Sequence, residues 1–187
     1  RIVGIVEKPK KGEEPSNMQV VGIYFFNKDF LSTLRKTPKG HYSLEKAISN
    51  FAKVNRLEVV QTKKDTVSLK YPWDLLNVKD YLFKHIKRRI SPNTHIAKSA
   101  EIIGRVVIED GARVMEGARV REPCFIGKNV IIGNNSLLRN GVDVEDNCVI
   151  GGYMEMKNTI FMRNSTTHSG FIGDSIIGVN CKIAAQF

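Results

Sequence analysis

This sequence of 187 residues lacks several features that define common protein classes. It has only three cysteines, Cys124, Cys148 and Cys181, and none of them belongs to a CxxC pair. A structural zinc site needs four closely placed ligands and a disulfide scaffold needs paired cysteines, so we expect neither. No apolar run approaches the roughly 18 residues that span a bilayer, which argues against an integral membrane protein. The sequence does not begin with methionine and shows no signal-like segment, so we expect a piece of a longer protein.

Acidic residues are also scarce relative to basic ones, with 19 Asp and Glu against 29 Lys and Arg, a net charge of +10. Such an excess favours anionic partners, including phosphates, nucleotides, coenzyme A and nucleic acid, although a solvated basic surface explains it equally well. The densest basic cluster lies at residues 84–89, where it suits the last turn of a helix. No nucleic-acid-binding signature accompanies it. We therefore expect no nucleic-acid partner, and keep a basic nucleic-acid-binding module as an alternative.

Residues 1–90 have the pattern of a mixed α/β region. Short apolar and β-branched runs predict four strands, at Ile2–Glu7, Val20–Phe26, Leu57–Gln61 and Thr66–Leu69. Helical spacing predicts three helices, at Asp29–Arg35, from an N-cap at Ser43 to Asn55, and from Pro72 onwards. The third helix has an apolar stripe formed by Trp73, Leu76, Tyr81, Leu82 and Ile86. Ser91-Pro92-Asn93 then marks a boundary, which predicts domains at 1–90 and 91–187.

A strict repeat of six residues begins at Ile96. Aliphatic residues or methionine occupy twelve successive positions of the repeat: Ile96, Ile102, Ile108, Val114, Val120, Ile126, Ile132, Leu138, Val144, Ile150, Met156 and Met162. Four residues after each of these positions the residue is usually small, as at Ala112, Cys124 and Cys148. A helix cannot keep a period of six on one face, whereas short strands joined by tight turns can. The repeat predicts a parallel β-helix of about 18 residues per coil, in which the cysteines are small buried residues.

The end of the repeat shows an irregularity. Its register shifts by three residues between Met162 and Phe171, and resumes at Phe171, Ile177 and Ile183. In a solenoid such a shift is typical of a loop expelled from the wall, and the shifted segment contains His168. The sequence stops partway through a coil without a cap, so we expect the β-helix to be truncated at its C-terminal end.

The motifs of the first half resemble those of a known enzyme family. The segments RIVGIVEKP at 1–9, VVGIY at 20–24 and YPWDLL at 71–76 resemble the C-terminal portion of sugar-1-phosphate nucleotidylyltransferases. With the hexapeptide repeats attached, the whole sequence resembles an archaeal-type bifunctional nucleotidylyltransferase and acetyltransferase, the type that makes UDP-N-acetylglucosamine. The implied fold is the C-terminal part of a Rossmann-like α/β domain, followed by a left-handed parallel β-helix.

The resemblance implies roles for four residues of the first half. Glu7 would accept hydrogen bonds from sugar hydroxyls, and Lys8 would meet the sugar phosphate. The backbone around Val20 would touch the sugar, and Gly22 would allow close approach. The family's glycine-rich nucleotide loop and its first Mg²⁺-binding aspartate would lie upstream of Arg1. Its second metal position falls at Ser68, whose neutral hydroxyl is a poor Mg²⁺ ligand, so we expect no metal ligand here and no nucleotidyl transfer by this chain alone.

In the second half the resemblance implies an acetyl-transfer site. Arg139 and Lys157 are 18 residues apart, which would stack them on adjacent coils where they could hold a sugar phosphate. His168 would be the catalytic base, taking a proton from an amino sugar as it attacks the thioester of acetyl-CoA. We expect a cytoplasmic homotrimer whose acyl sites form between subunits. The alternative keeps the nucleotidylyltransferase parentage, makes the β-helix a trimerisation or regulatory module, and leaves His168 without a role.

Overall fold

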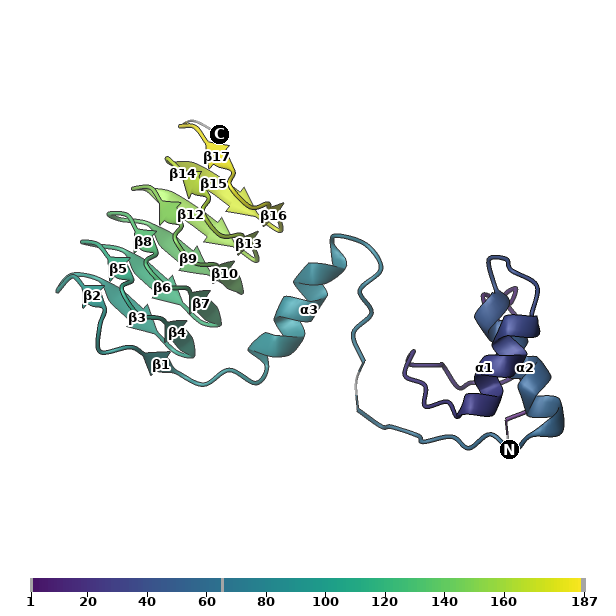
Figure 1. Cartoon of the computed structure of the whole chain (residues 1–187). Helices are drawn as coiled ribbons and strands as arrows, with labels where there is room; N and C mark the ends of the chain where they lie inside the picture. Colours follow the sequence, from purple (N-terminus) through teal and green to yellow (C-terminus); the bar gives the residue numbers. More distant parts are fainter. Residues whose placement is uncertain (1, 65, 186–187) are drawn as a thin grey trace. The chain divides into compact units, whose positions relative to one another are not determined.

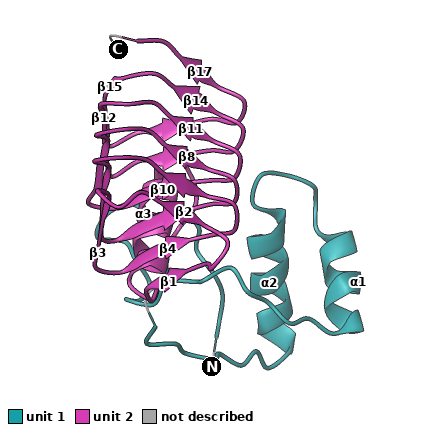
Figure 2. Ribbon diagram, turned by 90° about the vertical axis from the view of Figure 1, so that its left-hand side faces the viewer, with its two compact units in different colours: residues 1–66 teal, residues 67–187 magenta. Residues whose placement is uncertain are grey.

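The computed structural model describes residues 2–64 and 66–185. The chain divides into two compact units, residues 1–66 and residues 67–187 (Figure 2). The domain boundary predicted at residue 90 differs from the boundary between these compact units. The division into domains 1–90 and 91–187 stays a prediction.

The first unit contains two helices, α1 (Lys28–Lys36) and α2 (Ser43–Val54), which pack against each other. Their core is formed by Phe30, Ala47, Ile48 and Phe51. Both helices were predicted, and the structure confirms them. The predicted N-cap of α2 is wrong, because Tyr42 occupies that position and Ser43 is the first helical residue. The Ser43 hydroxyl instead accepts a hydrogen bond from the Gly40 N–H at 2.6 Å, which fixes the turn before the helix.

The four strands predicted for residues 2–69 do not form. Outside α1 and α2, residues 2–64 and 66–73 contain turns, bends and irregular backbone but no strand. A strand is stable only when a neighbour pairs its N–H and C=O groups, and no segment of these residues supplies that neighbour. Several apolar side chains of the predicted strands are consequently exposed, among them Val3, Ile23, Phe25 and Val60. The prediction of these four strands is therefore wrong for the described residues.

Helix α3 (Asp74–Phe83) opens the second unit. Its predicted apolar stripe is wrong, because Trp73 and Leu82 are exposed and the buried face consists of Lys79 and Phe83. The basic cluster at 84–89 lies beyond the end of the helix rather than in its last turn. There Arg88 donates from Nη1 to the carbonyl oxygens of Ile102 and Gly104, both at 3.1 Å, so this cluster contacts the first coils of the next element.

Residues 89–183 wind as a parallel β-helix with three sheets (Figure 1). Sheet A consists of β1 (Arg89–Ile90), β4 (Val106–Ile108), β7 (Cys124–Ile126), β10 (Val142–Val144), β13 (Ile160–Phe161) and β16 (Ile176–Ile177). Sheet B consists of β2 (His95–Ile96), β5 (Arg113–Val114), β8 (Ile131–Ile132), β11 (Val149–Ile150), β14 (Thr166–Thr167) and β17 (Lys182–Ile183). Sheet C consists of β3 (Glu101–Ile103), β6 (Arg119–Arg121), β9 (Leu137–Arg139), β12 (Met154–Lys157) and β15 (Gly170–Gly173).

The interior of the β-helix is the predicted one over most of its length. The positions of the repeat from Ile108 to Met156 are fully buried, and Ile96 and Ile102 pack against the same core. The small residues Cys124 and Cys148 are buried beside them, and both are free thiols. Burial raises the pKa of both thiols, which suits a packing role rather than a reactive one.

The irregularity near the end has a different cause from the one predicted. Phe161, not Met162, faces inward and pairs with Val144, and Ile172, not Phe171, pairs with Met156. The coils shorten from 18 residues to 17 and then to 16, as the register partners Asp143 with Ile160 and Ile160 with Ile176 show. Single residues are lost at the corners, so no loop leaves the wall, and only 168 and 169 lie between β14 and β15.

Helix α3 is attached to the β-helix through the side chain of Lys79. Its ammonium group is almost completely buried and donates three hydrogen bonds of 2.7 Å, to Asp80 Oδ1, the Gly141 carbonyl and Asn158 Oδ1. A buried ammonium group is stable only when its hydrogen-bonding capacity is filled, and here three acceptors fill it. The lysine therefore fixes the helix against two successive coils.

Candidate functional site

Two predicted phosphate ligands lie side by side on the outer face of sheet C. Lys157 of β12 is the register partner of Arg139 of β9, which confirms that these residues stack on adjacent coils. Arg139 forms an ion pair with Glu155 at 2.7 Å and keeps 30% of its side chain exposed. Lys157 lies 3.3 Å from Asp174 Oδ2. Both cations are therefore held in place and still face solvent.

Asp174 fixes the position of the Lys157 ammonium group. The Asn158 side chain donates a hydrogen bond of 2.7 Å to Asp174 Oδ1, and Lys157 binds the other carboxylate oxygen. These two hydrogen bonds, that from Asn158 first, lower the pKa of the Asp174 carboxyl below its usual value. The carboxylate stays ionised near neutral pH, so it holds the Lys157 ammonium group in position.

His168 lies in the corner between sheets B and C, directly after β14. Its imidazole is exposed, with Nδ1 3.3 Å from the Ser169 hydroxyl, while its backbone N–H donates to the Ile183 carbonyl at 3.1 Å. Gly151 lies one coil below, and a Cβ at that position would collide with the His168 carbonyl. The backbone of the histidine is thus fixed in the wall of the β-helix, whereas its ring is free to meet a ligand.

Within one chain the structure does not bring His168 to the two cations. Gly170 is the partner of Met154, and Gly173 is the partner of Lys157, so His168 precedes the start of β15 and Lys157 lies at its far end. Strand β15 alone covers about 10 Å at 3.3 Å per residue. His168 and the two cations therefore lie at opposite ends of β15.

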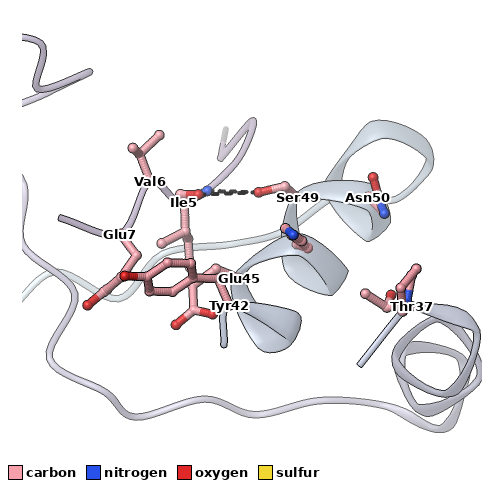
Figure 3. Close-up of a pocket in the computed structure, with 10 residues that line it drawn as sticks. Ile5, Val6, Glu7, Thr37, Tyr42, Glu45, Ser49 and Asn50 are labelled. Carbon is pink, nitrogen blue, oxygen red and sulfur yellow. Dashed lines mark hydrogen bonds between the residues drawn. The ribbon is translucent and has the colours of Figure 1, made fainter. Parts of the chain in front are cut away.

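The first unit has a cavity of about 450 Å³ that includes Glu7 (Figure 3). It lies between the segment 5–7 and helix α2, and its polar lining includes Tyr42, Glu45 and Asn50. The Ser49 hydroxyl accepts a hydrogen bond of 3.1 Å from the Ile5 N–H, which attaches this segment to the helix. The next residue, Lys8, has a left-handed backbone with φ +48° and does not line the cavity. Glu7 is thus presented at the end of an anchored segment.

The other two predicted sugar contacts, Val20 and Gly22, lie in an extended segment outside that cavity. Gly22 has φ +84° and open space where a Cβ would stand, which fits a position of close approach. Two residues later, burial raises the pKa of the Tyr24 hydroxyl, and the carboxylates of Glu45 and Glu7 add to the effect. Tyr24 therefore links this segment electrostatically to Glu7.

The described residues do not fit a Mg²⁺ ion. Ser68, where the resemblance implied a metal position, is exposed and supplies only a neutral hydroxyl, which is a poor Mg²⁺ ligand. Residues 2–64 and 66–185 contain no group of three or more His, Cys, Asp or Glu side chains that could hold a metal. In the same ranges no helix is long and apolar enough to cross a membrane. No step that uses a metal is derived from this chain.

Two charged residues with structural roles, Lys79 and Asp143, were not predicted from the sequence. Nothing in the local sequence marks Lys79 as buried, because lysine normally occupies the solvent face of a helix. Asp143 interrupts an apolar strand at an outward position between Phe125 and Ile160, and that interruption was a visible signal. A third omission is Arg121, which precedes Arg139 by the same 18 residues that separate Arg139 from Lys157.

Comparison with known proteins agrees with the enzyme family that the sequence motifs resemble. Residues 1–84 match the nucleotidyl transferase family, and residues 85–169 match the GMPPB C-terminal domain family. The bifunctional protein GlmU of Methanococcus aeolicus is 35% identical over 99% of this chain and 45% of its own length. Over nearly its whole length this chain is similar in sequence to that bifunctional protein. The bifunctional sugar-1-phosphate nucleotidylyltransferase/acetyltransferase of Sulfurisphaera tokodaii is 30% identical over 97% of this chain and 45% of its own length.

The chain thus spans about half the length of the bifunctional relatives that it matches. Among solved structures, the acetyltransferase domain of PglB from Neisseria gonorrhoeae, in complex with acetyl coenzyme A, is similar to this chain with a TM-score of 0.35 and 19% identity. That similarity covers 51% of this chain and 50% of the PglB domain. The nucleotidyltransferase match and the parallel β-helix agree with the fold class expected from the sequence.

Proposed function

We propose that this chain is part of a sugar-1-phosphate nucleotidylyltransferase whose β-helix transfers acetyl from acetyl-CoA to an amino-sugar phosphate. Residues 1–90 would belong to the nucleotidyltransferase domain and residues 91–187 to the acetyltransferase domain. The observation that carries the proposal is the register pairing of Arg139 with Lys157 on an exposed sheet, in a homologue of bifunctional enzymes.

The acetyl transfer that we propose follows from the chemistry of these side chains. Arg139 and Lys157 bind the phosphate of the amino sugar through charge-assisted hydrogen bonds. The neutral imidazole of His168 accepts a proton from the sugar amine as the amine nitrogen attacks the thioester carbonyl of acetyl-CoA. The C–S bond then breaks, the acetyl group remains on nitrogen as an amide, and coenzyme A leaves as the thiol after taking up a proton.

In the nucleotidyltransferase half, the proposal assigns sugar binding to Glu7, Lys8, Val20 and Gly22. The Glu7 carboxylate accepts hydrogen bonds from sugar hydroxyls, and the Lys8 ammonium meets the phosphate of the sugar-1-phosphate. The nucleoside triphosphate and its Mg²⁺ need ligands that the described residues do not offer. The sugar-1-phosphate, the nucleoside triphosphate and acetyl-CoA are metabolites of the cytoplasm, where we place the protein.

The test is an acetyl-transfer assay on the protein at its full length, with glucosamine-1-phosphate and acetyl-CoA as substrates. We expect His168→Ala to lower kcat at least about 100-fold, the usual size of a general-base contribution. The matched control is His95→Ala, which removes another exposed histidine from the β-helix. Equal activity of the His168 variant and the wild type would refute the role of the histidine.

A second candidate function is favoured by the separation of His168 from Lys157 within one chain. Here the β-helix serves only as a trimerisation or regulatory module of a nucleotidylyltransferase. A wild-type protein that assembles normally but shows no acetyl transfer to amino-sugar phosphates would favour this candidate over the first.

A further inference from the structure

The corner between sheets B and C is shorter at His168 than on the coil before it. On the coil of β11 and β12 this corner has three residues, 151–153, and on the next coil it has two, His168 and Ser169. The pairing of β11 with β14 and of β12 with β15 holds the two corners one coil spacing apart, about 4.8 Å. Tyr153, the last residue of the longer corner, thus lies on the coil next to His168 and Ser169.

The backbone of Tyr153 has a conformation that is unfavourable for a tyrosine. Its φ is +56°, in the left-handed region. The strand registers place Asn135 and then Gly117 at the same position on the two preceding coils, and both also have a positive φ. Glycine and asparagine adopt this conformation at little cost, whereas a bulky side chain strains it. A tyrosine at this corner therefore lowers the stability of the coil.

Packing of the tyrosine ring does not offset this cost. Tyr153 is 74% exposed, which makes it the most exposed Phe or Tyr side chain of residues 89–183. Its backbone is held in the wall, because its N–H donates a hydrogen bond of 2.8 Å to the Asn134 carbonyl. A strained residue whose side chain faces solvent is typical of a functional site rather than of a structural position.

The surface around His168 on these two coils consists largely of backbone. The two residues before Tyr153 are Gly151 and Gly152, so the longer corner contributes one side chain, that of the tyrosine. The shorter corner contributes the exposed imidazole of His168 and the Ser169 hydroxyl, which lies 3.3 Å from Nδ1. An exposed aromatic ring and an exposed imidazole thus share one corner.

We propose that Tyr153 binds the sugar ring of the amino-sugar phosphate and is a substrate-contact residue of the His168 site. The amine that His168 would deprotonate is bonded directly to the sugar ring, and a general base must approach it to about 2.6–3.2 Å. The sugar ring therefore lies over this corner. One coil spacing, about 4.8 Å, is also about the width of a pyranose ring. The inference rests on the proposed function, because it names a further contact of the acetyl acceptor.

The chemistry of the contact is the packing of a sugar on an aromatic face. One face of a pyranose presents C–H groups with a partial positive charge, and the face of a phenol ring is electron-rich. Such a contact binds the uncharged part of the acceptor, which neither the phosphate-binding cations nor the imidazole would hold. A change at Tyr153 should consequently alter the affinity for the acceptor and leave the affinity for acetyl-CoA unchanged.

The test is the acetyl-transfer assay on the protein at its full length, with Tyr153→Asn as the main variant. We expect the KM for glucosamine-1-phosphate to rise about ten-fold, the size of one aromatic contact, while kcat and the KM for acetyl-CoA stay unchanged. Tyr153→Phe keeps the ring and should keep the wild-type KM. The matched control is Tyr71→Asn, which removes another exposed tyrosine, outside the β-helix.

Thermal melting separates this role from a structural one. Tyr153→Asn should raise the melting temperature by about 2–4 °C, because asparagine relieves the left-handed strain. A variant that binds the acceptor more weakly while it melts higher has lost a contact with the substrate and not its fold. An unchanged KM for glucosamine-1-phosphate, an equal rise of both KM values, or the same effect from Tyr71→Asn would overturn the proposal.

Calorimetric titration without acetyl-CoA distinguishes failure of the inference from failure of the proposed function. We expect Tyr153→Asn to weaken the binding of glucosamine-1-phosphate about ten-fold and to leave the binding of inorganic phosphate unchanged. A wild-type protein without acetyl transfer contradicts the proposed function, and the titration still decides the role of the tyrosine. If the variant binds the sugar phosphate as tightly as the wild type does, the inference is wrong.

Discussion

The most unusual single residue of the β-helix is Asp143, an acidic side chain on the outer face of sheet A. Its register partners on either side are Phe125 and Ile160, so the carboxyl lies between two apolar neighbours. Burial, and after it the charge of Glu145, raise the pKa of Asp143, the Lys79 ammonium opposes them, and the resulting pKa is about 6. Because the folded pKa lies above the unfolded value of about 3.9, the ionised carboxylate disfavours folding above pH 6.

This shift predicts a pH-dependent effect of Asp143→Asn. At pH 7.5 the amide removes a buried negative charge, and we expect the free energy of unfolding to rise by about 2 kcal/mol. The gain should shrink as the pH falls through 6 and vanish near pH 4, where the wild-type carboxyl is protonated in the folded protein. Urea unfolding at both pH values measures the difference. A destabilised variant at pH 7.5 would show that attraction to Lys79 outweighs burial.

At the scale of elements, the corners of the coils depend on a column of asparagines. Asn129, Asn147, Asn164 and Asn180 all have left-handed backbones, with φ between +56° and +60°. The side-chain amides of the first three each donate to the side-chain oxygen of the asparagine on the next coil, at 3.1 to 3.3 Å, and Asn180 accepts the last of these bonds. Asparagine tolerates this backbone better than other residues with a Cβ, and the same amide links successive coils.

Substitution of Asn147 separates these two contributions. Asn147→Gly keeps the backbone freedom and loses only the amide ladder, which we expect to cost about 1 kcal/mol of unfolding free energy. Asn147→Ala loses the ladder and also strains the left-handed backbone, so it should cost about 1 kcal/mol more than the glycine variant. Chemical unfolding of the two variants provides the measurement. Equal losses would mean that backbone strain contributes nothing at this corner.

Comparison of the predicted and observed helices and strands shows which of them can be predicted from local sequence patterns. Helices α1 and α2 were predicted because their hydrogen bonds are internal, so the spacing of Phe30, Ile48 and Phe51 is sufficient evidence. The strands predicted at 2–7 and 20–26 were wrong because pairing depends on a neighbour that the local sequence does not describe. The shortened coils after Met156 were misread as one expelled loop, since the sequence gives the total shift and not the corners that absorb it.

For the whole molecule, the distance between His168 and Lys157 along sheet C makes assembly decisive for the proposed acetyl transfer. The three sides of a β-helix allow three copies to pack around an axis, and we predict a trimer by light scattering of the full-length protein. Such a trimer can bring the histidine of one copy to the cations of its neighbour. A monomer would contradict the prediction.

The shared site can be tested by mixing two inactive variants. In trimers assembled from equal amounts of His168→Ala and Lys157→Gln, about a quarter of the sites combine an intact histidine with an intact lysine. We expect the mixture to recover that fraction of acetyl transfer, although each variant alone is inactive. If the mixture stays inactive while native mass spectrometry shows mixed trimers, the site does not lie between subunits.

The sequence by itself determined the β-helix, its inward residues as far as Met156 and the stacking of Arg139 with Lys157, because a repeat of six residues fixes which side chains share a face. Its short motifs also indicated the enzyme family, and the comparisons with known proteins agree with that indication. Only the tertiary structure decided that Lys79 is buried and that Tyr153 lies exposed, on a left-handed backbone, one coil from His168. These features depend on contacts between coils and with α3, and the identity of a residue does not specify which neighbours the fold brings to it.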